Sequence, residues 1–238
     1  MIHEPAPGPI GFFSDAHGNT EAFLVAYNSL KAAGAKDVWY LGDLVGYVPD
    51  PVIVSKAQAL PINCLSGNHE AMLLSSTEPG PREGAYRHHE IRCSLSGSDL
   101  AFLEGLNPSA RLDVNGKRLL VVHGSPTDPI NGYIYPDTDL STFKDTEADL
   151  VFAGHTHRPM DRSIEGIRFI NVGSCGLPRD GRGVASACLY DPEANQVKFL
   201  DLEISETCRD LMERYNLSSV VTKHYQAIID HKTSKEIN

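Results

Sequence analysis

The sequence lacks the features of a disulfide-rich, secreted or membrane-spanning protein. Its 238 residues contain five cysteines, an odd number with no C-x-x-C pair, which predicts neither a disulfide framework nor a zinc knuckle. No apolar run reaches the roughly 18 residues of a transmembrane helix, and the first segment, MIHEPAPGPIGFF, lacks the basic and apolar regions of a signal peptide. We therefore expect a cytoplasmic protein with reduced thiols and no membrane partner.

Positive charge is also scarce. Lysine and arginine total 21 against 31 acidic residues, which gives a formal net charge of −10. This balance argues against general nucleic-acid binding, which normally needs a basic face. It is compatible with an anionic substrate, because bound divalent metals reverse the sign of the charge inside a cleft. Nothing in the composition determines the oligomeric state.

The first seventy residues alternate between two kinds of segment. Apolar runs that break off into polar loops, as a strand ending in a loop would, cover 9–19, 37–51 and 62–70. Helical spacing of apolar residues covers 20–34 and 51–60, and Gly34 is a plausible stop signal. Strand, helix, strand, helix and strand in this order predict a parallel sheet with crossover helices.

From about residue 113 the chain is rich in strands. Asn115-Gly116 is a hairpin signal, and further short strands are predicted within 148–157, 167–176, 185–191 and 196–204. Helical spacing returns at Ser205, and we expect the polar last dozen residues to be frayed. We predict an α/β fold with two facing sheets and helices outside. It forms a single domain over 1–238, with a core of about 10–204 and a C-terminal helical tail of about 205–238.

Seven residues of metal-binding type follow the predicted strands. They occur in the motifs D-A-H, G-D, G-N-H-E, V-H-G and G-H-T-H, and are Asp15, His17, Asp43, Asn68, His123, His155 and His157. Because the carboxyl ends of parallel strands lie along one edge of a sheet, these side chains should converge there. Taken singly, an Asp after a strand is more often a turn former or a helix cap. The conjunction of all seven favours a metal site.

The ligand types favour two divalent metal ions. Carboxylate and imidazole groups without thiolate suit manganese, iron or zinc. Two ions about 3.5–4 Å apart need a bridging group, and a carboxylate has two oxygens that can reach both ions. An Asn oxygen is neutral and leaves more positive charge for a phosphate.

These motifs resemble the calcineurin-like metallophosphoesterase superfamily over residues of about 10 to 190. The stretches GDLVGYVPDP and NVGSCGLPRDGRG look like its small bacterial and archaeal branch, often of phosphodiesterase type. The resemblance implies a four-layer α/β/β/α sandwich of two mixed sheets. It also implies two divalent cofactor ions, manganese first, with iron, zinc, nickel or cobalt as alternatives.

The resemblance also implies a role for each residue. The first metal ion would be held by Asp15, His17 and His157, and the second by Asn68, His123 and His155, with Asp43 as the bridge. His69 matches the histidine that contacts the substrate and protonates the leaving alkoxide. A metal-bridging hydroxide would attack a small-molecule or nucleotide phosphoester.

One departure from the family bears on the substrate. Phosphatases of the superfamily carry G-D-x-V-D-R-G, but here Gly46 and Tyr47 stand where Asp and Arg would fall. Without that arginine clamp we favour a phosphodiester over a monoester or protein phosphatase substrate. Arg158, Arg179 and Tyr47 are candidate substrate contacts. A non-catalytic scaffold of the same fold is a further alternative, but it is disfavoured by the presence of His69.

Two other features have plainer interpretations. His88 and His89 are adjacent in a predicted helix, so their side chains point apart. We expect a surface or substrate-cleft helix there rather than a third metal site. Cys175 lies near the predicted site, but nothing marks it as a nucleophile, and we expect a structural role.

Overall fold

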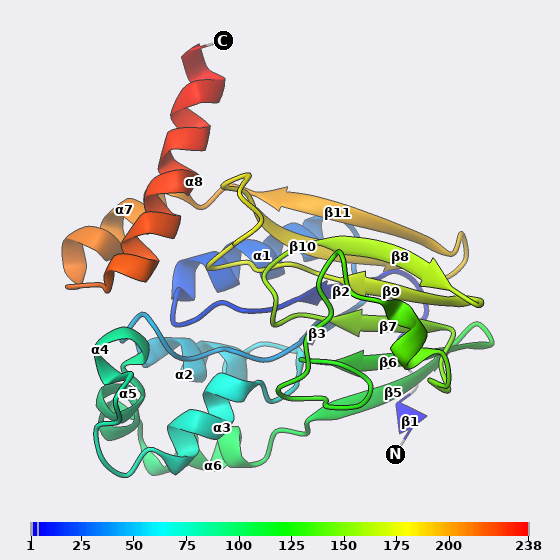
Figure 1. Cartoon of the computed structure of the whole chain (residues 1–238), viewed down its shortest axis with the longest axis horizontal. Helices are drawn as coiled ribbons and strands as arrows, with labels where there is room; N and C mark the ends of the chain where they lie inside the picture. The colour runs from blue at the N-terminus through cyan, green and yellow to red at the C-terminus, as the bar shows by residue number, and fades with distance from the viewer. Residues whose placement is uncertain (1, 4, 238) are drawn as a thin grey trace.

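Two mixed β-sheets pack face to face in the computed structural model, which describes residues 2–3 and 5–237 (Figure 1). The five-stranded sheet consists, in spatial order, of β11 (Gln196–Leu202), β10 (Ala185–Asp191), β2 (Ile10–Phe13), β3 (Asp37–Tyr40) and β4 (Asn63–Cys64). The six-stranded sheet consists of β1 (Ile2–His3), β5 (Ser109–Val114), β6 (Lys117–Val122), β7 (Leu150–Ala153), β9 (Ile167–Asn171) and β8 (Met160–Ile164). The predicted class, α/β with two facing mixed sheets flanked by helices, is confirmed.

The parallel part of the five-stranded sheet forms as predicted. Strands β2, β3 and β4 are parallel and are joined by α1 (Thr20–Ala32) and α2 (Val52–Ala59). The Asn19 side chain caps α1 by accepting the Ala22 N–H at 3.0 Å. The helix ends just before Gly34, whose φ of +100° suits glycine. Sequence signals at both ends of α1 therefore set its length.

An apolar core fills the space between the sheets. In β6, Leu119 and Val121 face the other sheet, whereas Leu120 and Val122 belong to a separate cluster on the outer face. This alternation follows from the period of two along a strand. Phe12 and Phe152 stack across the interface with ring centroids 4.0 Å apart. The two sheets are thus held as one rigid base for the loops at their edges.

The outer faces are covered unequally. The five-stranded sheet packs against α1, α2, α7 (Ser205–Arg214) and α8 (Ser219–Ile237). The outer face of the six-stranded sheet is covered by the loop between β6 and β7, whose regular structure is a short 3-10 helix, η1 (Leu140–Phe143). That loop buries Ile134, Leu140 and Phe143 against the sheet.

Two local predictions are corrected. We expected GNHE to lie in a loop after a strand, but Asn68 is the first residue of α3 (Asn68–Ser75). That helix opens a helical insert between β4 and β5, completed by α4 (Glu83–Tyr86), α5 (His88–Ser94) and α6 (Gly97–Glu104). The polar last dozen residues were expected to fray, but α8 remains helical to Ile237 (Figure 1). Ile228, near the start of that stretch, is buried against the core.

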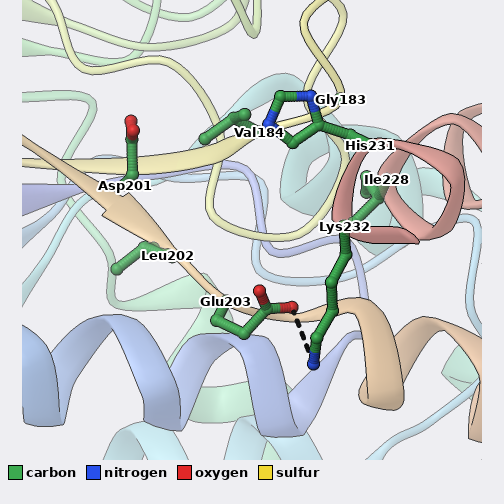
Figure 2. A pocket seen from close by; sticks show the side chains of 8 residues that line it. All are labelled: Gly183, Val184, Asp201, Leu202, Glu203, Ile228, His231 and Lys232. Atoms are coloured by element: carbon green, nitrogen blue, oxygen red, sulfur yellow. Dashed lines mark ion pairs between the residues drawn. The ribbon is translucent and has the colours of Figure 1, made fainter. Parts of the chain in front are cut away.

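A cavity of about 270 Å³ lies between α8 and the end of β11 (Figure 2). Lys232 reaches across its rim and places Nζ 3.8 Å from Glu203 Oε1. No helix within the described part of the chain is both long and apolar enough to cross a membrane. All five cysteines are free. The cytoplasmic location and the single-domain organisation stay predictions.

Candidate metal centre

The predicted ligands lie where strands of both sheets end. Asp15 and His17 follow β2, Asp43 follows β3, and Asn68 follows β4 at the start of α3. From the six-stranded sheet, His123 follows β6, and His155 and His157 follow β7. Because β2, β3 and β4 are parallel, and so are β6 and β7, these ends meet at one edge of the sandwich.

The side chains form two clusters that share one carboxylate. In the first cluster, ligand atoms from four buried residues lie within 4.8 Å of one another: Asp15, His17, Asp43 and His157. The second cluster has the same spacing and consists of Asp43, His123 and His155. Asn68 joins it, because its Oδ1 lies 3.1 Å from His123 Nε2. The structure therefore brings all seven predicted residues together.

A single oxygen of Asp43 faces both clusters. Its Oδ2 lies 3.7 Å from His17 Nε2 and 3.4 Å from His123 Nε2. The other oxygen, Oδ1, accepts the His69 backbone N–H at 2.8 Å. The sequence indicated only that a carboxylate can reach both ions, and this hydrogen bond engages Oδ1. Oδ2 is the atom placed to bridge.

Most of these residues have a left-handed backbone conformation, which directs their side chains into the site. Five of the seven residues have φ between +51° and +66°: Asp15, His17, Asp43, His155 and His157. A non-glycine residue in this region costs on the order of 1–3 kcal/mol, so the surroundings must hold it there. Hydrogen bonds between the loops do so: the Asp15 N–H donates to the Gly42 carbonyl at 3.1 Å, and the His17 N–H to the Asp43 carbonyl at 3.0 Å.

Backbone carbonyls orient three of the histidine rings. The Nδ1–H groups of His17 and His123 donate to the carbonyls of Val45 and Leu41, at 3.3 and 2.8 Å. His157 donates from Nδ1 to the Leu177 carbonyl in the same way. In each ring this leaves Nε2 as the nitrogen directed at the cluster, which is the usual support for a metal-binding histidine.

Glu70 is a buried carboxylate that the sequence analysis missed. Its Oε2 accepts the N–H groups of Gly67 and Asp43 at 2.7 and 2.8 Å, and its Oε1 accepts those of Leu44 and Val45 at 2.8 and 3.1 Å. Burial and then the charge of Asp43 raise the pKa of Glu70 to about 7, against these hydrogen bonds. Glu70 thereby ties the Asp43 loop to the start of α3.

The charges of the buried groups in the two clusters favour the binding of cations. Burial lowers the pKa of His69 to about 3 and that of His155 to about 4, so these rings are neutral at pH 7. Burial acts to lower the pKa of His123, but the charge and hydrogen bond of Asp43, together with the charges of Asp15 and Glu70, outweigh it and raise that pKa to about 9. A proton on His123 is what Asp43 attracts when no other cation is near. A metal ion bound there would take the place of that proton.

The residues present fit two divalent metal ions. Within the described residues, Asp15 Oδ1 is buried with no hydrogen-bond partner, and it lies 3.2 Å from His157 Nε2 and 3.8 Å from His17 Nε2. Buried polar atoms normally find partners. Five imidazole or amide groups and two carboxylates supply nitrogen and oxygen donors without thiolate, which suits manganese, iron or zinc.

A cleft of about 160 Å³ opens over the two clusters and contains the predicted substrate contacts. Tyr47, Arg158 and Arg179 all line it, together with His69. Arg179 donates from Nη2 to the Tyr47 hydroxyl at 2.9 Å, and its guanidinium lies 5.5 Å from the Tyr47 ring centre. The stretch GDLV lacks the arginine that follows it in related phosphatases. Here an arginine reaches the site from the loop after β9 instead.

His69 is held by aromatic neighbours rather than by a carboxylate. His88 Nε2 lies 3.0 Å from His69 Nδ1, and the Tyr47 ring stacks on His69 at 5.0 Å. Gly46 makes room for this ring, because a Cβ there would lie 2.1 Å from His69 Nδ1. Of the His88-His89 pair, His88 is buried and contacts His69 from behind the cleft lining, without itself lining the cleft. Cys175 is fully buried, in keeping with a structural role.

Comparison with known proteins gives the same assignment. A model of the calcineurin-like phosphoesterase superfamily domain matches residues 9–195. The uncharacterized protein MJ0912 of Methanocaldococcus jannaschii is 32% identical over 215 residues, covering 82% of this chain and 87% of that protein. A crystal structure of a metallophosphoesterase from Sphaerobacter thermophilus superimposes with a TM-score of 0.78 at 28% identity, covering 92% of this chain and 98% of the other.

The chain belongs to the calcineurin-like phosphoesterase superfamily. Within it, the chain resembles the small archaeal and bacterial members, as the motifs predicted. The hypothetical protein PH1004 of Pyrococcus horikoshii shares the fold, with a TM-score of 0.75, 20% identity, and coverage of 90% of this chain and 96% of that one. The protein is a metallophosphoesterase with a buried His/Asp cluster suited to metal.

We predict two metal ions per chain and a dominant contribution from Asp43. Asp43→Asn keeps an oxygen for the His69 N–H but puts an amide NH₂ in place of Oδ2, the atom that faces both clusters. Occupancy of both metal positions should fall. Losing a residue that only supports a ligand lowers metal affinity by about 10–100-fold, and we expect the loss of a shared ligand to lower it at least as much. Elemental analysis of manganese-loaded protein measures this. Saturation near one ion in the parent protein, or full occupancy in the variant, contradicts the assignment.

Glu70→Gln should weaken metal binding without touching a ligand. Either orientation of the amide turns its NH₂ toward two backbone N–H groups, so two of the four hydrogen bonds that join the Asp43 loop and Gly67 through this side chain are lost. We expect about 10–100-fold weaker metal affinity and a free energy of unfolding lower by about 1–3 kcal/mol. Calorimetric metal titration and denaturant unfolding measure the two effects. The exposed Glu104→Gln, at the end of α6, is the matched control, and equal behaviour of the two variants removes Glu70 from this role.

Proposed function

We propose that this protein is a dinuclear metal-dependent phosphodiesterase, with manganese as its metal. One ion would be held by Asp15, His17 and His157 and the other by Asn68, His123 and His155, with Asp43 shared between them. The observation that supports this proposal most is the position of Asp43 Oδ2 between the two clusters. A single metal ion would need only one of these clusters.

Bound divalent ions of this kind supply an activated water molecule and neutralise the charge of the phosphate. The chain's own groups complete the site. His69 donates a hydrogen bond to the leaving oxygen, with Nδ1 occupied by His88 and Nε2 left for the substrate. Arg179 lines the same cleft and places its guanidinium near a phosphate bound there. For His69 to act as a general acid, the phosphate charge has to raise its pKa from about 3.

The shape of the cleft supports a diester. Gly46 and Tyr47 replace the Asp-Arg pair that grips a terminal phosphate in related phosphatases, and Tyr47 is buried beside His69. The rim carries aromatic side chains, including Tyr86, Tyr133 and Tyr135. A monoester dianion gains little from such a rim, whereas the second ester group of a diester would pack against it.

The assay that tests this proposal compares two chromogenic esters with the same leaving group. Bis(4-nitrophenyl) phosphate and 4-nitrophenyl phosphate are offered to protein loaded with manganese, and again after chelation. We expect metal-dependent hydrolysis with the higher kcat/KM for the diester. A higher value for the monoester makes the protein a phosphomonoesterase. Failure to hydrolyse either ester with both metals bound supports a non-catalytic scaffold.

His69→Asn should discriminate between substrates by the quality of the leaving group. A positioned general acid contributes typically about 10²–10⁴-fold, but nitrophenolate leaves readily without protonation, whereas an alkoxide does not. The variant should therefore retain both metals and lose much more rate on an alkyl phosphodiester than on a nitrophenyl one. Equal losses on both substrates would make His69 a binding residue, and loss of a metal would make it a ligand.

A further inference from the structure

Two tyrosines stand exposed at the mouth of the cleft. Tyr133 is 50% exposed and Tyr135 is 36% exposed, and both belong to the loop between β6 and β7. Their rings are parallel, with an interplanar angle of 2° and centroids 5.4 Å apart. We call this pair the tyrosine platform. Isolated apolar side chains at a surface need no explanation, but a stacked pair beside a metal-binding cleft is a built feature.

The loop holds the platform rigidly. Ile134, between the two tyrosines, is buried against the six-stranded sheet, so its neighbours on both sides turn outward. The Tyr135 N–H donates to Thr138 Oγ1 at 2.8 Å. Arg162 of β8 donates from Nη1 to the carbonyls of Pro136 and Thr138, each at 2.8 Å. A platform fixed in this way loses little conformational entropy when a flat group binds to it.

The platform is continuous with the candidate metal site. The Tyr133 ring lies 4.0 Å from the ring of His155, a proposed ligand of the second metal. Arg158 carries its guanidinium 5.7 Å from the centre of the Tyr135 ring and donates from Nε to the Arg179 carbonyl at 3.2 Å. A phosphate bound over the two clusters would therefore have aromatic faces on one side and two arginines beside it.

We propose that the tyrosine platform binds the base of a nucleoside phosphoester. This inference rests on the proposed function only in that the phosphate is bound at the metal clusters. Stacking on an aromatic face is available to every base, because every base has a π-face, and a nearby arginine adds a cation–π contribution. The platform should therefore select nucleotides over sugar or glycerol phosphates while discriminating little between bases.

Covering the metal site does not account for Tyr135. Tyr133 alone lies over His155, whereas Tyr135 packs on Tyr133 and opens to solvent. Tyr135 makes its ring contacts with Tyr133 and Arg158 instead of with a ligand. It therefore extends the aromatic surface beyond the ring that covers His155.

The test measures binding to the manganese-loaded protein, without turnover. The probes are the non-hydrolysable phosphonate analogues of adenosine 5′-monophosphate and ribose 5-phosphate, which differ only in the base. Calorimetry should show at least about tenfold tighter binding of the adenosine analogue, the scale of one stacked base. Tyr135→Leu should abolish this preference, whereas Tyr135→Phe, which retains the ring, should preserve it.

Each other outcome counts against the platform. Equal affinity of the parent protein for the two probes, or no binding of either, overturns the inference. If Tyr135→Leu weakens both probes alike, Tyr135 supports the metal site instead of the base. Because neither probe is hydrolysed, the result is independent of whether the enzyme prefers diesters. If the protein prefers monoesters but binds the adenosine analogue through Tyr135, the phosphodiesterase proposal is refuted and the proposal that the tyrosine platform binds a base is retained.

Discussion

The left-handed backbone at the ends of β2, β3 and β7 is the constraint on which the candidate site depends. A residue there cannot continue the strand, so the chain turns sharply and alternate side chains, such as Asp15 and His17, enter the same small volume. Each such residue is costly in isolation. The cost is offset because the loops hydrogen-bond to one another, as when the Gly18 N–H donates to the Leu44 carbonyl at 2.8 Å. The ligand loops therefore stabilise each other, and none would hold its shape alone.

Glu70 extends the same logic to α3. Four backbone hydrogen bonds hold the Glu70 carboxylate in a site that already contains Asp15 and Asp43. Because Glu70 is buried, solvent screens its charge little. Such an arrangement is unfavourable unless cations are close by. The raised pKa of His123 expresses the same demand. We therefore expect folding of the loops to be coupled to binding of divalent ions, because such ions would supply the positive charge that the buried carboxylates require.

The sequence predicted which residues form the site, but it did not predict the details of their geometry. Asp15, Asp43, His123 and His155 each follow an apolar strand, and strand ends meet at one sheet edge, so convergence followed from topology. The hydrogen bond that leaves only Oδ2 of Asp43 for bridging depends on a turn no spacing rule specifies. Glu70 falls in a stretch that the sequence assigned to a loop, and its burial becomes visible only when four N–H groups converge on it. Tyr133 and Tyr135 lie in a loop without periodicity, where their exposure could not be deduced.

The candidate metal ligands and most of the cleft walls come from different parts of the fold. The ligands sit on strand ends braced by the core between the sheets, where Phe12 and Phe152 stack, and this base tolerates little change. The walls of the cleft come from elsewhere: Tyr86 from the helical insert, Arg179 from the loop after β9, and the tyrosine platform from the loop that covers the six-stranded sheet. The loop after β9 also braces the ligands, because the Arg179 N–H donates to the His157 carbonyl at 3.1 Å. The tyrosine platform contacts His155 through the Tyr133 ring. We therefore expect substitutions at Tyr135 to change which ester is accepted while the two metal clusters keep their geometry.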